Sequence, residues 1–319
     1  MDKLQITYLV FGLLIISAIV FDLGLLSKKN TIISLKAAII QTIFWIILAL
    51  SFFVFLWFED GKNTAFEYIS AYLMEWSLSI DNIFVFIIIF SSFKVKEKFY
   101  GRVLLIGILM AILLRIIFIT VGVALVNQFH WVIYIFGIFL LFTGYKMFSS
   151  SDKEVFDPHD SKIFKFLQRY FPLTSHDGEG QFVIREKGRP LYTSLFVVVV
   201  LLAMIDIVFA IDSIPAVFGI SRENIVIYTS NIFAVLGLRS MFFLLRGAIS
   251  KFDYLQQGIA IVLVIIGAKM LLETQISKFI NKDIQTVSSL ILILMCIFGS
   301  IFYSIYHQKK GVPKDRPST

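Results

Sequence analysis

Residues 192–219 read YTSLFVVVVLLAMIDIVFAIDSIPAVFG, an apolar run long enough to cross a membrane as a helix. Two aspartates, Asp206 and Asp212, interrupt this run. An ionised side chain in the middle of a bilayer costs about 2.5–3.5 kcal/mol on insertion scales, and such residues usually serve a function. The stretch therefore predicts a transmembrane helix that carries carboxylates for a purpose other than packing.

The composition of the whole chain agrees with this interpretation. Of its 319 residues, 58% are hydrophobic and 16% are charged, and the mean hydropathy is +0.85. Soluble domains are about 45–50% apolar and about 25% charged, so we exclude a soluble single domain, a disordered or collagenous chain and a nucleic-acid-binding protein. The net charge of +7 is typical of basic cytoplasmic loops. The single cysteine, Cys296, excludes an intrachain disulfide and a cysteine-rich metal site.

Nine apolar segments have transmembrane length, so the sequence predicts an all-α polytopic membrane protein. Most connections between these segments are short. The connection at 150–191 differs because it holds seven acidic residues, seven basic residues and three prolines, so we expect it to lie in water. The predicted spans are 4–26, 37–58, 66–93, 102–126, 130–149, 192–219, 225–248, 254–273 and 285–306.

Lysine and arginine gather in the loops after the first, third and fifth spans and in the tail. The loop after the seventh span has only Lys251, and the loops after the second, fourth, sixth and eighth spans have at most two basic residues each. The positive-inside rule then predicts an external N-terminus and a cytoplasmic C-terminus. The predicted organisation is two N-terminal helices (1–58), a first three-helix unit (66–149), a cytoplasmic loop (150–191), a second three-helix unit (192–273), a C-terminal helix (285–306) and a basic tail (307–319).

The two three-helix units match each other in their acidic motifs. Each motif has an acid, five further residues, a second acid and a small side chain that bears oxygen. The motifs are Glu75-Trp-Ser-Leu-Ser-Ile-Asp81-Asn82 and Asp206-Ile-Val-Phe-Ala-Ile-Asp212-Ser213. Spans 3–5 are therefore expected to repeat as spans 6–8.

The basic residues of the two units match as well. Arg115 and Arg239 follow in the second helix of each unit, and the third helices contain Gly144-Tyr-Lys146-Met147 and Gly267-Ala-Lys269-Met270. Because three is an odd number of helices, the second unit enters the membrane from the opposite side. Inverted repeats of this kind are typical of transporters, whose substrate site lies near the midplane where the repeats meet.

Three arrangements of these charges fit the sequence. In the first, four acids and four bases form a closed, purely structural network. In the second, a bent or unwound helix turns both acids of each motif toward one site, because a spacing of six residues otherwise separates them by about 120°. In the third, only Asp81 and Asp212 meet, while Glu75 and Asp206 serve the entrances or bind arginine.

Arg115 and Arg239 are expected at mid-depth, each paired with a carboxylate as a charge-balancing group. Lys146 and Lys269 lie near helix ends, from which their side chains can reach water.

The oxygen-rich surroundings of the acids favour a hard divalent cation such as Mn²⁺, Mg²⁺ or Ca²⁺. The candidate metal ligands are Asp81, Asp212, Glu75 and Asp206, with Asn82, Ser213 and Ser79 as supporting polar groups and Ser77 nearby. None of the four histidines falls among the acids, which argues against zinc.

These motifs resemble the TerC/Alx family of bacterial membrane proteins. The segment Thr229-Ser-Asn231-Ile-Phe-Ala-Val-Leu-Gly-Leu-Arg239 is similar to that family as well. The resemblance implies a multi-pass protein of the bacterial inner membrane, manganese export, and a relation to the LysE group of small exporters. One position departs from the family pattern, because Ala203 stands where members usually have a glutamate three residues before the first acid of the second motif.

The leading hypothesis is a secondary transporter that moves Mn²⁺ outward, in exchange for protons, with no permanently bound cofactor. Its expected partners are the divalent ion and the lipid bilayer. One alternative is a scaffold for membrane-protein assembly or stress resistance of the tellurium-resistance type, which would dock partners on 150–191. Another is an exporter of a different small cation, such as a basic amino acid. An enzyme is not expected, because the spans contain no nucleophile–base pair or cofactor motif.

The predicted topology can be tested with reporter fusions. A reporter placed after Thr319 or within 150–191 should read cytoplasmic, and one inserted near Lys62 should read external. An external signal from 150–191 would contradict both the orientation and the inverted repeat, since both rest on the same loop assignment.

Overall fold

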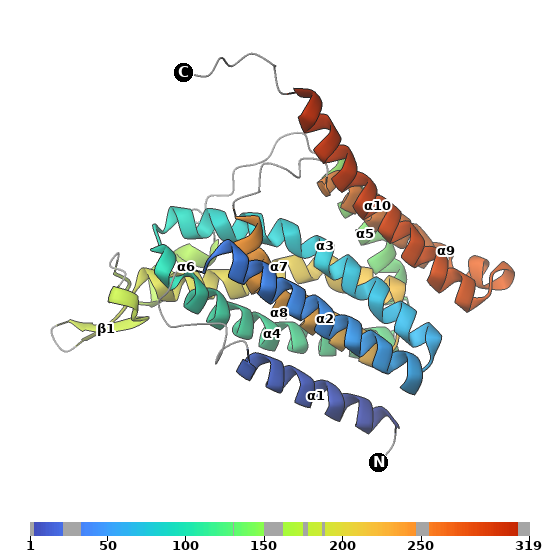
Figure 1. The fold of residues 1–319 in the computed structure, drawn as a ribbon, viewed down its shortest axis with the longest axis horizontal. Helices are drawn as coiled ribbons and strands as arrows, with labels where there is room; N and C mark the ends of the chain where they lie inside the picture. Colours follow the sequence, from blue (N-terminus) through green and yellow to red (C-terminus); the bar gives the residue numbers. More distant parts are fainter. Residues whose placement is uncertain are drawn as a thin grey trace.

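The protein is described by a computed structural model that covers residues 3–21, 33–129, 131–149, 162–174, 178–186, 189–246 and 255–311. Within the described residues, a long helix occupies each predicted span (Figure 1), while residues 22–26, 130, 247–248 and 254 of those spans lie outside the described residues. The helices are α1 (Lys3–Phe21), α2 (Leu35–Glu59), α3 (Lys62–Ser92), α4 (Glu97–Gln128), α5 (Val132–Ser149), α7 (Ser194–Ile220), α8 (Asn224–Leu245), α9 (Leu255–Phe279) and α10 (Lys282–Gly311).

Within the described residues, five helices are long and apolar enough to cross a membrane. These are α2, α4 and α8 in full, residues 194–211 of α7 and residues 284–304 of α10. Shorter apolar stretches lie in α1, α5 and α9. The fold is thus that of an all-α membrane protein, and the number of nine spans stays a prediction.

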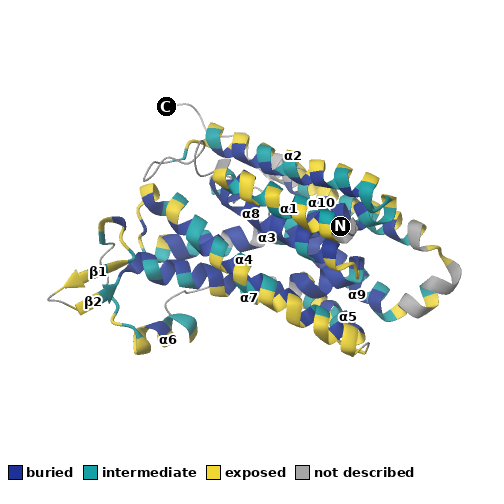
Figure 2. Ribbon diagram, turned by 90° about the horizontal axis from the view of Figure 1, so that it is seen from below, coloured by how far each residue is buried: buried dark blue, intermediate teal, exposed yellow. Residues whose placement is uncertain are grey.

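Helix α8 forms the centre of the bundle and packs against α2, α3 and α4. Its residues from Ile225 to Phe243 are buried except Tyr228, and the visible part of α8 is mostly dark blue in Figure 2. The buried set includes polar side chains, among them Asn231 and Arg239. Because a helix enclosed on all sides has no lipid-facing stripe, these polar groups must find their partners inside the protein.

Other helices pack around this centre: α3 lies against α8, α4 against α7, and α5 along α9. Two glycines set the close approach of the last pair. A Cβ atom added to Gly144 would lie 2.8 Å from the carbonyl oxygen of Ala260, and one added to Gly267 would lie 2.8 Å from the carbonyl oxygen of Gly137. Neither position has room for a larger residue.

Part of the charged connection at 150–191 is folded, which its charge pattern does not predict. It contains the short helix α6 (Lys162–Tyr170), a 3₁₀ turn η2 (Gly178–Gly180) and an antiparallel hairpin of β1 (Val183–Glu186) and β2 (Arg189–Tyr192). The hairpin projects from one end of the bundle (Figure 2).

Two contacts anchor this folded segment to the helices. Arg102 of α4 donates a hydrogen bond of 2.9 Å to the Gly180 carbonyl oxygen. The ring of Phe171 packs against Phe196 in the first turn of α7. The segment therefore belongs to the end of the bundle where α4 and α7 begin.

The close approach of α5 and α9 gives a testable prediction. Alanine normally stabilises a helix interior over glycine by about 1 kcal/mol, and Gly12 of α1 has open space around it. We expect Gly12→Ala to leave the melting temperature unchanged or higher. Gly267→Ala should lower the stability by about 1–3 kcal/mol, because its methyl group meets backbone atoms of α5. Thermal unfolding in detergent, followed by circular dichroism, measures both, and equal melting temperatures would contradict the packing.

Candidate functional site

The largest fully buried side chain in the described structure is that of Arg115 of α4, which is 1% exposed. Its Nε and Nη2 atoms donate to the two carboxylate oxygens of Asp206, at 3.0 and 2.9 Å. Its Nη1 atom donates to Oδ1 of Asn231 at 3.0 Å and to Oε1 of Glu75. One guanidinium on α4 thus joins α3, α7 and α8.

Helical spacing explains why these acceptors converge. On α3, Glu75, Ser79 and Asn82 stand at positions i, i+4 and i+7, so they share one face of the helix over about two turns. On α7, Asp206 and Ser213 stand at i and i+7. All five side chains are buried, and α3 packs against α7. The two helices therefore carry polar stripes into the interior of the bundle.

Several oxygens of this region lack a hydrogen-bond partner within the described part of the chain. They are Oε2 of Glu75 and the hydroxyls of Ser77, Ser79 and Ser213. A buried oxygen without a partner costs about 1–3 kcal/mol, so native proteins rarely contain several together. These oxygens are therefore candidates to bind a ligand or water.

The structure describes the side chains of two of the four predicted acids. Glu75 and Asp206 both form ion pairs with Arg115. This agrees with the part of the third arrangement above in which these two acids bind an arginine. Asp81 and Asp212 lie within α3 and α7, and their side chains fall outside the described residues. The described side chains contain no group of three His, Cys, Asp or Glu residues able to hold a metal. Metal binding by the acids therefore stays a prediction.

The helices that carry the acids are continuous. Helix α3 runs from Lys62 to Ser92 and α7 from Ser194 to Ile220, with Pro215 inside α7. An unwound segment between the two acids of a motif, one of the arrangements considered above, is not present in either helix.

The other predicted basic groups lie on α8, α5 and α9. Arg239 of α8 is 3% exposed and has interactions of its own. Lys146 lies in the last turn of α5, near a helix end as expected. Lys269 of α9 donates to the hydroxyl of Ser289 on α10, at 3.1 Å. Neither lysine has a described ion pair with Glu75 or Asp206, whose described ion pairs are with Arg115.

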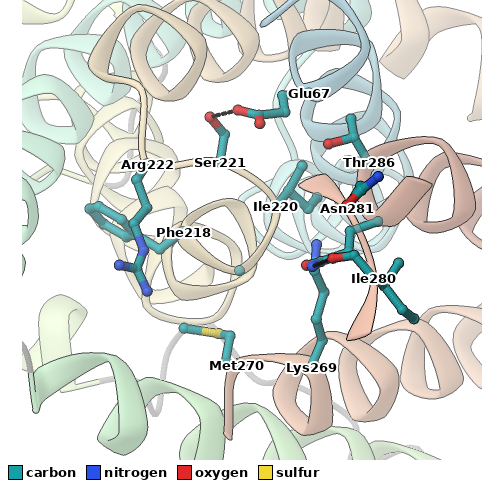
Figure 3. A pocket seen from close by; sticks show the side chains of 12 residues that line it. Glu67, Phe218, Ile220, Ser221, Arg222, Lys269, Met270, Ile280, Asn281 and Thr286 are labelled. Carbon is teal, nitrogen blue, oxygen red and sulfur yellow. Dashed lines mark hydrogen bonds between the residues drawn. The ribbon is translucent and has the colours of Figure 1, made fainter. Parts of the chain in front are cut away.

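A third buried carboxylate, Glu67, was not among the predicted site residues. It is 2% exposed, accepts a hydrogen bond from the Ser221 hydroxyl, and borders a cavity of about 390 Å³ (Figure 3). The same hydroxyl accepts from the backbone N–H of Glu223 at 3.1 Å, so Glu67 ties the turn between α7 and α8 to α3. Lys269 and Asn281 lie on another side of this cavity. A glutamate eight residues before Glu75 in the same helix was the available signal.

Comparison with known proteins identifies the family. The model of the integral membrane protein TerC family matches residues 60–311. The chain belongs to the TerC family. The resemblance drawn from the acidic motifs is thereby confirmed, and the matched region contains both motifs and all four predicted acids.

Relatives of this TerC protein cover most of its length. A membrane protein of Myxococcus xanthus, named as uncharacterized, is 43% identical over 256 residues, which is 80% of each chain. One of Rickettsia felis is 38% identical over 295 residues, 92% of this chain and 97% of the relative. A protein of Escherichia coli K12 named "Putative membrane-bound redox modulator Alx" is 36% identical over 271 residues, 82% of this chain and 84% of the relative. No protein of solved structure gives a significant match.

The pairing of Arg115 gives a prediction about stability. Arg115→Ala should destabilise the protein by about 3–5 kcal/mol, because it leaves two carboxylates buried without their cation. Adding Asp206→Asn to Arg115→Ala should restore part of the loss, which unfolding of the purified variants in denaturant would measure.

The matched control is Arg246→Ala. Arg246 pairs with Glu97 at 3.3 Å at the exposed end of the bundle, so its loss should cost at most about 1 kcal/mol. Strict additivity of Arg115→Ala and Asp206→Asn would show that the two side chains do not depend on each other.

Proposed function

We propose that the protein is a secondary transporter that exports a divalent cation, Mn²⁺, from the bacterial cytoplasm. The observation that carries this proposal is the set of buried oxygens on α3 and α7 without a hydrogen-bond partner in the described structure. A purely structural network would be expected to satisfy them. Carboxylate and hydroxyl oxygens without a thiolate are the ligands that Mn²⁺ and other hard divalent ions prefer.

The charges of the bundle interior support a divalent substrate. The predicted site contains four carboxylates, and two arginines are buried with it. Four negative and two positive charges leave a formal charge of −2, which one Mn²⁺ or two protons would neutralise. Because uncompensated charge is costly inside a membrane, this balance favours exchange of one metal ion for two protons.

The packing of the helices supports the predicted inverted repeat. In the predicted repeat, α3, α4 and α5 correspond to α7, α8 and α9. The counterpart of the α3–α8 contact is then the α7–α4 contact, and the structure contains both contacts. The glycine contacts follow the same rule, because Gly144 approaches Ala260 as Gly267 approaches Gly137, and both pairs of equivalent positions are 123 residues apart. Two repeats around a central site are a common architecture for alternating access.

The name of the Escherichia coli relative suggests a redox function, which we considered as an alternative to transport. A dithiol–disulfide couple within one chain needs two cysteines, and this chain has only Cys296. The scaffold alternative draws on the folded segment at 162–192, which leaves Phe166 and Tyr170 exposed. A scaffold should tolerate neutralisation of the interior acids, whereas a transporter should not.

This difference defines the test. Inside-out membrane vesicles that contain the protein should accumulate radioactive Mn²⁺, and Asp81→Asn or Asp212→Asn should reduce the initial rate at least about tenfold at matched protein level. Asparagine keeps the size and one oxygen of aspartate but removes the charge that attracts the metal. Asp81→Asn combined with Asp212→Asn should be hardly worse than either change alone, because the acids are expected to share one ion.

The control variant is Glu97→Gln, which removes a carboxylate of α4 that pairs with Arg246 at the exposed end of the bundle. It should transport at the wild-type rate. Wild-type transport by both aspartate variants would leave the scaffold function as the better account.

A further inference from the structure

The place of Arg115 within the predicted site points to a role beyond charge balance. We infer that the Arg115 guanidinium occupies the cation site when no metal is bound, and that the exported divalent ion displaces it. This inference rests on the proposed function and adds to it a mechanism that sets affinity. The arginine is a tethered competitor of the substrate.

The contacts of Arg115 are those of a bound cation. Every acceptor around the guanidinium is an oxygen: two from Asp206, one from Glu75 and one from Asn231. Carboxylate and amide oxygens of this kind are also the ligands of hard divalent ions. A guanidinium and a metal ion would therefore compete for one set of atoms.

The burial of the site requires a cation to be present at all times. Glu75 and Asp206 are each 1% exposed, and two carboxylates so close together cannot remain ionised in a dry interior without a positive charge. Arginine keeps its positive charge under all physiological conditions, so Arg115 always neutralises part of the negative charge of the two carboxylates. It is the built-in counterion of the metal-free protein.

One carboxylate oxygen of the site does not contact Arg115. Oε2 of Glu75 is buried and lacks a hydrogen bond within the described structure, although Oε1 of the same group contacts Arg115. The Ser213 hydroxyl lies near Glu75 and interacts with its carboxylate. A metal ion that first binds these atoms would share Glu75 with Arg115 before displacing it.

This competition has a consequence for transport. A carrier must hold its substrate strongly enough to collect it and weakly enough to release it. Because the metal must displace Arg115, part of its binding energy is lost, and the return of the guanidinium favours release. A purely structural arginine would have no such effect on affinity.

The test measures Mn²⁺ binding and transport by the purified protein and its variants. Arg115→Lys keeps the positive charge, and with it the fold, but an ammonium cannot bind Asp206 through two parallel hydrogen bonds. We expect it to lower the apparent Kd for Mn²⁺ by about tenfold, measured by electron paramagnetic resonance of free Mn²⁺. In proteoliposomes the KM and kcat should fall together, since a tighter site releases more slowly. Arg246→Lys, at the exposed Glu97 pair, should change neither.

Chemical rescue provides a second variant. In Arg115→Ala, added guanidinium ion should raise the apparent Kd for Mn²⁺ and stabilise the protein, while sodium chloride at equal ionic strength should not. In the wild-type protein the same guanidinium concentration should have no effect on the Kd.

The outcomes separate the two proposals. An unchanged or higher Kd in Arg115→Lys, with guanidinium inert in Arg115→Ala, would overturn the competitor role while wild-type transport of Mn²⁺ still supports the exporter. If neither the wild-type protein nor any variant binds or transports Mn²⁺, the proposed function itself fails.

Discussion

The cost of placing an ionised group in a membrane interior is the constraint on which the rest of this structure depends. Arg115 is buried to 1% exposure and carries a charge that it cannot lose, so the fold must supply oxygens to it from every side. Helices α3, α7 and α8 each contribute one residue for this purpose, Glu75, Asp206 and Asn231. Their mutual packing is therefore linked to the satisfaction of a single guanidinium.

The outer helices hold this centre in place by close backbone contact. Gly144 and Gly267 let α5 and α9 approach until a methyl group would meet a carbonyl oxygen. Interfaces of small residues are common between membrane helices, where burial of apolar surface cannot drive association because lipid is equally apolar. The interior carboxylates thus neutralise the buried charge of Arg115, and the glycines of α5 and α9 allow these helices to associate within the bilayer.

The sequence predicts much of this fold because hydropathy reports transmembrane length directly. Within the described residues each predicted span coincides with a helix. The equal spacing of the two acidic motifs singles out four acids, Glu75, Asp81, Asp206 and Asp212, without showing which of them contact an arginine. The choice of partners for Arg115 could not be predicted, because it depends on how four helices are rotated about their axes. Glu67 was missed since its partner, Ser221, lies 154 residues away. The hairpin was missed because its two strands are only four residues long and show no alternation of apolar and polar residues.

The central claim is that the interior of the bundle binds a divalent cation between α3 and α7. Crystals of the protein soaked in Mn²⁺ and measured at the manganese absorption edge test it most directly, since anomalous scattering locates the metal without assumption. The account predicts one strong peak beside Glu75 and Asp206, with Arg115 moved away from at least one of these carboxylates. Manganese peaks confined to the surface, with the Arg115 contacts unchanged, would contradict it.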